Sequence, residues 1–263
     1  METIPRTAGA VAGVILMYAG HSAIMGPIGS FSGMIAALAL STIWIIWETR
    51  QAGAESRRLQ SLGKILVLNR TGIASAIGSA AYVAAPLAIV SVVAPTIQST
   101  FAMADRVKGL ISIASAPVTK VLQGWVPRGT ESTRVRRANI AIASASMLGI
   151  LLGVGTMIST QSLVSWLGNG QISVSWGVAL LLSACVSITL FRSVLERAVL
   201  ATFEQLHIVA KAIAAGSIVG LPLVGVGAHQ LGTVGALGGV LAGLLVCVVV
   251  ELFGLFRFLR FVK

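Results

Sequence analysis

The chain has 263 residues, of which 56% are hydrophobic and 10% are charged, and its mean hydropathy is +0.93. In soluble domains about a quarter of the residues are charged, because polar groups must cover the surface. The composition of this chain therefore excludes a water-soluble globular protein and predicts an integral membrane protein. The net charge of +11 would indicate nucleic-acid binding in a soluble protein, but these cations lie in short segments between apolar runs, where they set membrane topology, and we expect no nucleic-acid partner.

Eight apolar runs are long enough to cross a hydrocarbon layer of about 30 Å, which takes about 20 helical residues. In chain order they lie at residues 8–25, 30–47, 72–93, 100–125, 138–159, 172–191, 208–228 and 233–256. Each run is expected to be helical because lipid offers no hydrogen-bond partner to a free backbone amide. The predicted fold class is therefore an all-α integral membrane protein, a polytopic bundle of about eight transmembrane helices that contacts the lipid bilayer.

Among the connections between these runs, only alternate ones contain lysine or arginine. The basic connections are residues 50–64, 128–137, 192–197 and 257–263. The others are residues 26–29, 94–99, 159–171 and 228–232, and they contain neither Lys nor Arg. The positive-inside rule then predicts that the basic connections and both termini are cytoplasmic, which requires an even number of spans.

The basic segment 192–207 has a pattern of its own. Leu195, Val199, Phe203 and Leu206 share one helical face, whereas Arg192, Glu196 and Glu204 lie mostly off it. Two structures fit this pattern equally well: a short amphipathic helix on the inner membrane surface, or a cytoplasmic extension of the neighbouring span.

Small residues four apart and prolines within the spans indicate how the helices pack. Pro86, Pro117 and Pro222 permit bends, which transporters use but which also occur as static kinks. Cys185 and Cys247 have neither metal-ligand nor disulfide spacing and are interpreted as small packing residues. The glycine pairs that predict close helix approach are Gly149/Gly153, Gly216/Gly220, Gly235/Gly239 and Gly239/Gly243.

The sequence carries no motif of a known catalytic centre. It has no Walker A sequence, no His-Glu-x-x-His and no Gly-x-Ser-x-Gly, and its eight acidic residues are dispersed. None of the connections predicted to face outward is large enough to hold a catalytic domain. We therefore expect no enzyme activity, no cofactor and no metal site.

Asp105, Arg106 and Lys108 are the charged residues that demand an explanation, because they fall in the first third of the fourth predicted span. A charge deep in a membrane costs several kcal/mol. Three charged side chains within four consecutive residues would therefore not face lipid. Asp105 and Lys108 are three apart and can pair, which leaves Arg106 unpaired. Either these residues line a polar cavity that takes an anionic substrate such as a diphosphate headgroup, or the span begins later and they lie at the outer interface.

Arg70 lies at the cytoplasmic end of the third predicted span. Its long side chain can extend to the lipid headgroups, which is the ordinary role of such a residue. The alternative is that Arg70 lines the inner mouth of the same cavity.

The stretch Ala85–Val107 resembles the seventh-to-eighth helix junction of Wzx-type polysaccharide flippases. That family shows an aromatic, two residues, then alanine, an acidic or polar residue, a cation and an aliphatic. Here these positions are Phe101, Ala104, Asp105, Arg106 and Val107. Ala116-Pro117-Val118, Val126-Pro127-Arg128 and the late Gly232–Ala236 also resemble later segments of the family.

The resemblance implies a fold and an activity. Flippases of the multidrug/oligosaccharidyl-lipid/polysaccharide exporter superfamily have twelve or more helices in two six-helix lobes, and they move lipid-diphosphate-linked sugars by alternating access without a cofactor. Residues 1–64 would be the last two helices of a first lobe with a basic cytoplasmic loop, and residues 65–263 a six-helix second lobe. The chain would then be truncated at its N-terminus, with a second copy or a missing N-terminal half completing the cavity.

By this resemblance, the protein would act in the cell inner (plasma) membrane in lipopolysaccharide or exopolysaccharide synthesis. Its substrate would be a lipid-linked oligosaccharide, with Arg106 and Lys108 contacting the diphosphate and Asp105 tuning or pairing them. Three other hypotheses stay open: an ion-coupled multidrug exporter that uses Asp105 or Glu251, a non-transporting remnant, and a membrane enzyme acting on polyprenyl-linked sugars.

Overall fold

The computed structural model describes residues 70–262. The chain divides into two compact units, Met1–Ile65 and Leu66–Lys263, and the described residues belong to the second. The predicted spans 8–25 and 30–47 and the basic loop that follows them lie outside the described residues.

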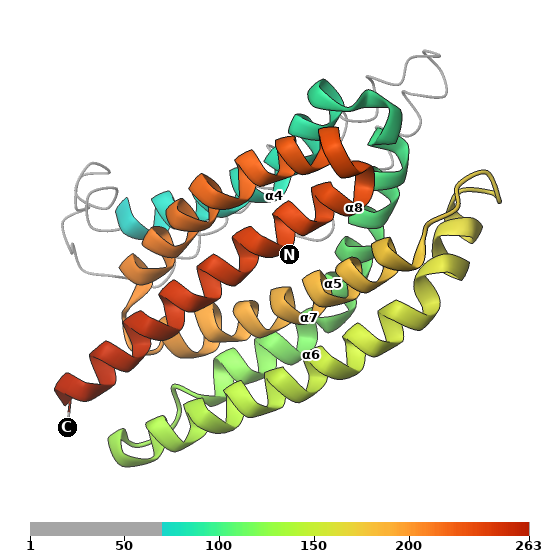
Figure 1. The fold of residues 1–263 in the computed structure, drawn as a ribbon. Helices are drawn as coiled ribbons and strands as arrows, with labels where there is room; N and C mark the ends of the chain where they lie inside the picture. Colours follow the sequence, from blue (N-terminus) through green and yellow to red (C-terminus); the bar gives the residue numbers. More distant parts are fainter. Residues whose placement is uncertain (1–69, 263) are drawn as a thin grey trace, which may run out of the picture. The chain divides into compact units, whose positions relative to one another are not determined.

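The described unit is entirely helical (Figure 1). In chain order its elements are α4 (Arg70–Val93), the 3₁₀-helix η1 (Pro95–Ile97), α5 (Gln98–Trp125), α6 (Glu131–Leu167), α7 (Trp176–Val194), the π-helix η2 (Leu195–Leu200) and α8 (Leu206–Val262). The all-α prediction is confirmed for this part of the chain. Pro86, Pro117 and Pro222 lie inside α4, α5 and α8, as expected.

Three helices within residues 70–262 are long and apolar enough to cross a membrane. They are Thr133–Leu167, Trp176–Leu200 and Leu206–Phe258. In α4 the apolar part is the shorter segment Tyr82–Val93. The helix α5 is not among the three, because charged and hydroxyl side chains interrupt its apolar sequence.

The longest element, α8, is two helices joined at Gly232. That residue has φ 61° and ψ −141°, a backbone conformation that interrupts the helix. The two halves then run back along each other, with the backbone of Gly227 against Gly235 and that of Gly220 against Gly243. Figure 1 shows the chain reversing between its orange and red portions. The reversal separates the two predicted apolar runs at 208–228 and 233–256.

Glycines allow the helix backbones to approach closely, as the sequence predicted. A methyl group added to Gly149 of α6 would lie 3.0 Å from the carbonyl oxygen of Ser187 on α7. The Ser187 hydroxyl donates a hydrogen bond of 2.8 Å to the Gly149 carbonyl oxygen. An alanine there would need the neighbouring helix to move, so small residues decide the spacing of this pair.

The two kinds of connection lie at opposite ends of the unit. At one end, Gly232 lies beside Ile97, with the Ile97 methyl 3.7 Å from where a Gly232 side chain would begin. At the other end, the rings of Phe203 and Phe258 lie 5.8 Å apart. The first end holds the connections 94–99 and 228–232, which lack Lys and Arg, and the second holds residues next to the basic connections 192–197 and 257–263.

The segment after α7 is not a separate amphipathic helix. The chain continues from α7 directly into η2, where Leu195 and Val199 are fully buried, and then turns into α8. The extension of the preceding span was therefore the correct alternative. The placement of Arg192 off the apolar face was wrong, because its side chain is buried and pairs with Glu251 on α8.

Candidate functional site

Asp105 and Lys108 form an ion pair on the second and third turns of α5. The Lys108 Nζ lies 2.5 Å from the Asp105 Oδ1, and the two side chains are 19% and 30% exposed respectively. The predicted pairing of these residues is confirmed. Its cause is local, because residues three apart on a helix lie one above the other on the same face.

Arg106 does not join this pair. The Arg106 side chain is exposed and has no ion-pair partner among the described residues, since it points about 100° away around the helix. Arg70 is the first residue of α4, and its side chain lies outside the described part of the chain. The structure thus brings Asp105 and Lys108 together and leaves Arg106 apart from them.

A polar stripe runs along α5 from this ion pair. We define the α5 stripe as Asp105, Lys108, Ser112, Ser115 and Thr119, which are spaced alternately by three and four residues. At about 100° per residue they fall within an arc of roughly 80°, and at about 1.5 Å per residue they extend over about 21 Å. That length is about two-thirds of a hydrocarbon layer of roughly 30 Å.

The two serine hydroxyl groups of the stripe are satisfied within their own helix. The Ser112 hydroxyl donates to the Lys108 carbonyl oxygen at 2.9 Å, and the Ser115 hydroxyl donates to the Ser112 carbonyl oxygen at 3.0 Å. These bonds remove the cost of burying the donors. Each hydroxyl oxygen keeps lone pairs that can accept a hydrogen bond from a ligand.

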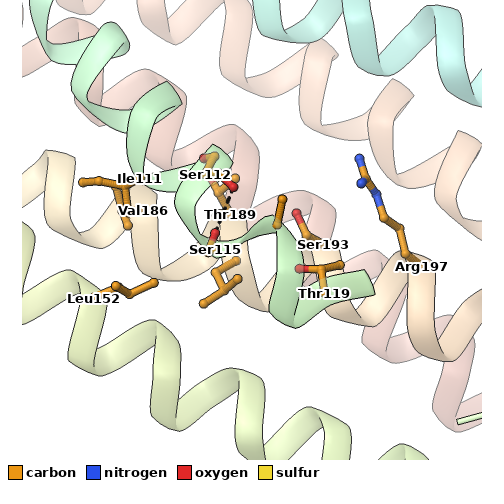
Figure 2. A pocket seen from close by; sticks show the side chains of 11 residues that line it. Ile111, Ser112, Ser115, Thr119, Leu152, Val186, Thr189, Ser193 and Arg197 are labelled. Atoms are coloured by element: carbon orange, nitrogen blue, oxygen red, sulfur yellow. Dashed lines mark hydrogen bonds between the residues drawn. The ribbon is translucent and has the colours of Figure 1, made fainter. Parts of the chain in front are cut away.

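The C-terminal part of the α5 stripe, from Ser112 to Thr119, borders a small cavity between α5, α6, α7 and η2 (Figure 2). Its volume is about 120 Å³. Its lining consists of Ile111, Ser112, Ser115, Ala116, Thr119, Leu152, Val186, Thr189, Leu190, Ser193 and Arg197. Figure 2 shows the hydroxyl-bearing side chains of α5 and α7 on facing sides, with Arg197 at one end.

The size and lining of the cavity limit what it can bind. Sites for drug-sized ligands occupy about 300–1,000 Å³, so a cavity of about 120 Å³ takes one polar group and not a whole oligosaccharide. Hydroxyls can bind a sugar or a phosphate, and the Arg197 guanidinium adds a preference for an anion. The site therefore fits one polar or anionic part of a larger molecule.

Sequence reasoning missed most of this site. The three-and-four spacing from Asp105 to Thr119 was visible in the sequence and could have revealed the α5 stripe. The facing residues Thr189 and Ser193 carry no such signal, because only the packing of α7 against α5 makes them part of the cavity. Arg197 was interpreted only as a topology signal.

A second charged cluster consists of Arg192, Glu196 and Glu251, and none of these residues lines the cavity. The sequence suggested a functional role for Glu251 alone. Arg192 Nε donates to Glu251 Oε1 at 3.0 Å, and Arg192 Nη2 lies 2.5 Å from Glu196 Oε1. The sequence suggests Glu251 as an ion-coupling carboxylate of the last span. The Glu251 side chain is fully buried.

Comparison of the chain with protein-family models, curated proteins and solved structures gives no match. The resemblance to polysaccharide flippases rests on the sequence motifs between residues 85 and 236.

Proposed function

We propose that this protein is a membrane carrier of the polysaccharide-flippase type. It would translocate lipid-diphosphate-linked sugars across the plasma membrane for cell-surface polysaccharide synthesis, by alternating access. The observation that supports this function most is the α5 stripe, which faces hydroxyls of α7 and has a cation near each end, Lys108 and Arg197.

The energetic cost of this stripe favours a role in binding. A single Lys or Asp at the centre of a membrane helix costs about 2.5–3.5 kcal/mol. Pairing of Lys108 with Asp105 lowers that cost, and the serine hydroxyls are satisfied by the backbone, but apolar residues at the same positions would avoid it. A path for a polar substrate explains why polar side chains line the inside of a helix bundle.

The arrangement favours an anionic substrate over a cationic drug. A multidrug exporter needs a membrane carboxylate that is free to bind its cation. Asp105, the acid of the α5 stripe, is already paired with Lys108, and Glu251 contacts Arg192 and does not line the cavity. By contrast, the exposed Arg106 lies beside the ion pair in sequence and is free to bind a diphosphate oxygen.

The proposal includes the topology of the whole chain. We propose six membrane spans formed by α4, α5, α6, α7 and the two halves of α8. The runs at 8–25 and 30–47 add two more spans, and both termini lie in the cytoplasm. The separation of basic and cation-free connections to opposite ends of the described unit supports this arrangement.

Export of surface polysaccharide tests the assigned roles, in a strain that lacks its own flippase. Loss of one charged hydrogen bond costs about 1.5–3 kcal/mol, so Lys108→Ala and Arg106→Ala should each reduce export by about tenfold to a hundredfold at equal protein level. Lys120→Ala is the matched control, because this exposed lysine on the same helix lies off the stripe.

The double variant Asp105→Ala/Lys108→Ala separates binding from folding. If Lys108 serves only to neutralise Asp105, removing both charges should restore export, whereas a substrate contact predicts that export stays low. Unchanged export in Lys108→Ala and Arg106→Ala would remove their assigned roles. A wild-type chain that inserts but never restores export would favour the non-transporting alternative.

A further inference from the structure

Arg192, Glu196 and Glu251 form a buried cluster where α7, η2 and the second half of α8 meet. We call these three residues the Arg192 cluster. Its guanidinium contacts both carboxylates, Glu251 through Nε at 3.0 Å and Glu196 through Nη2 at 2.5 Å. The side chains of Arg192 and Glu196 are 10% and 19% exposed, and that of Glu251 is completely buried.

The charges in this cluster do not balance. Two carboxylates share one guanidinium, and no second cation pairs with either of them within residues 70–262. The other titratable groups that act on the cluster are Tyr82 of α4 and Cys247 of α8, and both are ordinarily neutral at neutral pH. With every acid ionised, the cluster would carry one uncompensated negative charge in a low-dielectric interior, which is strongly unfavourable.

Two buried carboxylate oxygens of the cluster accept no hydrogen bond from the described residues, Glu196 Oε1 and Glu251 Oε2, and of these only Glu196 Oε1 lies within ion-pair distance of Arg192. Glu251 Oε2 is buried and accepts no hydrogen bond from the described residues, whereas Oε1 accepts from Arg192. A buried charged oxygen without a donor is costly. An O–H at that position removes the charge and leaves the bond to Oε1 intact.

We infer that the Arg192 cluster is a proton-binding site, in which Glu251 Oε2 holds the proton and Arg192 neutralises Glu196. The proton is taken from hydronium in bulk solvent, which becomes water, and it adds to one carboxylate oxygen without any other change in covalent bonding. A metal cation would be repelled by the guanidinium that already occupies the carboxylates, which leaves the proton as the ligand that fits. This inference stands independently of the transported substrate.

The position of the site connects proton binding to helix packing. Arg192 and Glu196 lie one turn apart across the start of η2, and Glu251 is 59 residues from Arg192 along the chain. A π-helical turn is wider than an α-helical one and often accompanies a functional site. When Glu251 loses its proton, two charged carboxylates share one guanidinium, which weakens the contact that this cluster makes between α7 and α8.

Infrared spectroscopy of the purified full chain in lipid nanodiscs tests the inference without any transport assay. At neutral pH the wild-type protein should show the carbonyl stretching band of a protonated carboxylic acid, and the band should shift when glutamate side chains are labelled with ¹³C. Glu251→Gln should abolish this band. Glu196→Gln should also abolish the band. Glu251 is then the one carboxylate that pairs with Arg192, so their charges cancel and Glu251 is ionised.

Two control variants should keep the band. Asp105→Asn removes an acid that already has its own cation, and Glu204→Gln removes an exposed one. A wild-type protein without the band would overturn the inference, and so would a band that persists in Glu251→Gln. If Glu251→Gln does not fold, Glu196→Gln decides alone, and an unchanged band there would contradict the charge balance.

Discussion

Single glycine residues determine how closely the helices of this protein pack. Gly238 and Gly239 are neighbours on the second half of α8 but face different surroundings. A side chain at Gly239 would meet the backbone of Leu223, 2.6 Å from its carbonyl carbon, whereas one at Gly238 would have nothing within 4 Å. This adjacent pair therefore separates the effect of backbone contact from that of helix propensity.

We expect Gly239→Ala to lower the free energy of unfolding by about 1–3 kcal/mol, which is the usual cost of overpacking a tight contact. Gly238→Ala should leave it unchanged or raise it by up to about 1 kcal/mol, because alanine favours a helix more than glycine does. Thermal unfolding of the purified variants in detergent measures both. Equal melting temperatures would show that the two halves of α8 do not touch at Gly239.

At the scale of elements, the reversal of α8 decides whether this segment crosses the bilayer once or twice. The whole segment from Leu206 to Phe258 is apolar enough to be continuous, and only the backbone conformation at Gly232 divides it. A φ of 61° with a ψ of −141° is accessible to glycine and strained for other residues. The two antiparallel halves therefore depend on one residue.

Gly232→Ala should destabilise the protein by about 1–3 kcal/mol, because any L side chain is strained in this conformation. The matched control is Gly225→Ala on the same element, where a methyl group would make an ordinary contact of 3.5 Å with Ile89. Protease resistance and melting temperature of both variants in detergent provide the comparison. If Gly232→Ala behaves like the control, the hairpin does not require glycine.

At the scale of the whole molecule, the distribution of cations predicts which end faces the cytoplasm. The described unit separates Gln171, in a connection without Lys or Arg, from His207, which follows η2 at the basic end; both are exposed. The two native cysteines are buried and should contribute little background to labelling.

A membrane-impermeant thiol reagent should label Gln171→Cys in intact cells, and it should label His207→Cys only after permeabilisation. The wild-type chain serves as the control for Cys185 and Cys247. Labelling of both introduced cysteines from outside, or the reverse order, would contradict the proposed orientation.

The helices themselves could be predicted from the sequence. The runs at 72–93, 100–125, 138–159 and 172–191 correspond to α4, α5, α6 and α7, because hydropathy and the need to satisfy the backbone are properties of contiguous residues. The Asp105–Lys108 pair was predictable for a related reason, since its partners lie one helical turn apart. In both cases the spacing of residues along the chain was sufficient for the prediction.

The sequence by itself determined the helical fold, the apolar character of the chain and the local ion pair on α5. The tertiary structure decided which side chains meet across helices. It placed the hydroxyl groups of α7 against the cavity. It also brought Arg192 into contact with Glu251 in the interior, although the sequence predicted that Arg192 lies in a basic connection. Arg192 and Glu251 are 59 positions apart, and local spacing along the chain carries no information about such a contact, which depends on how α7 and α8 pack.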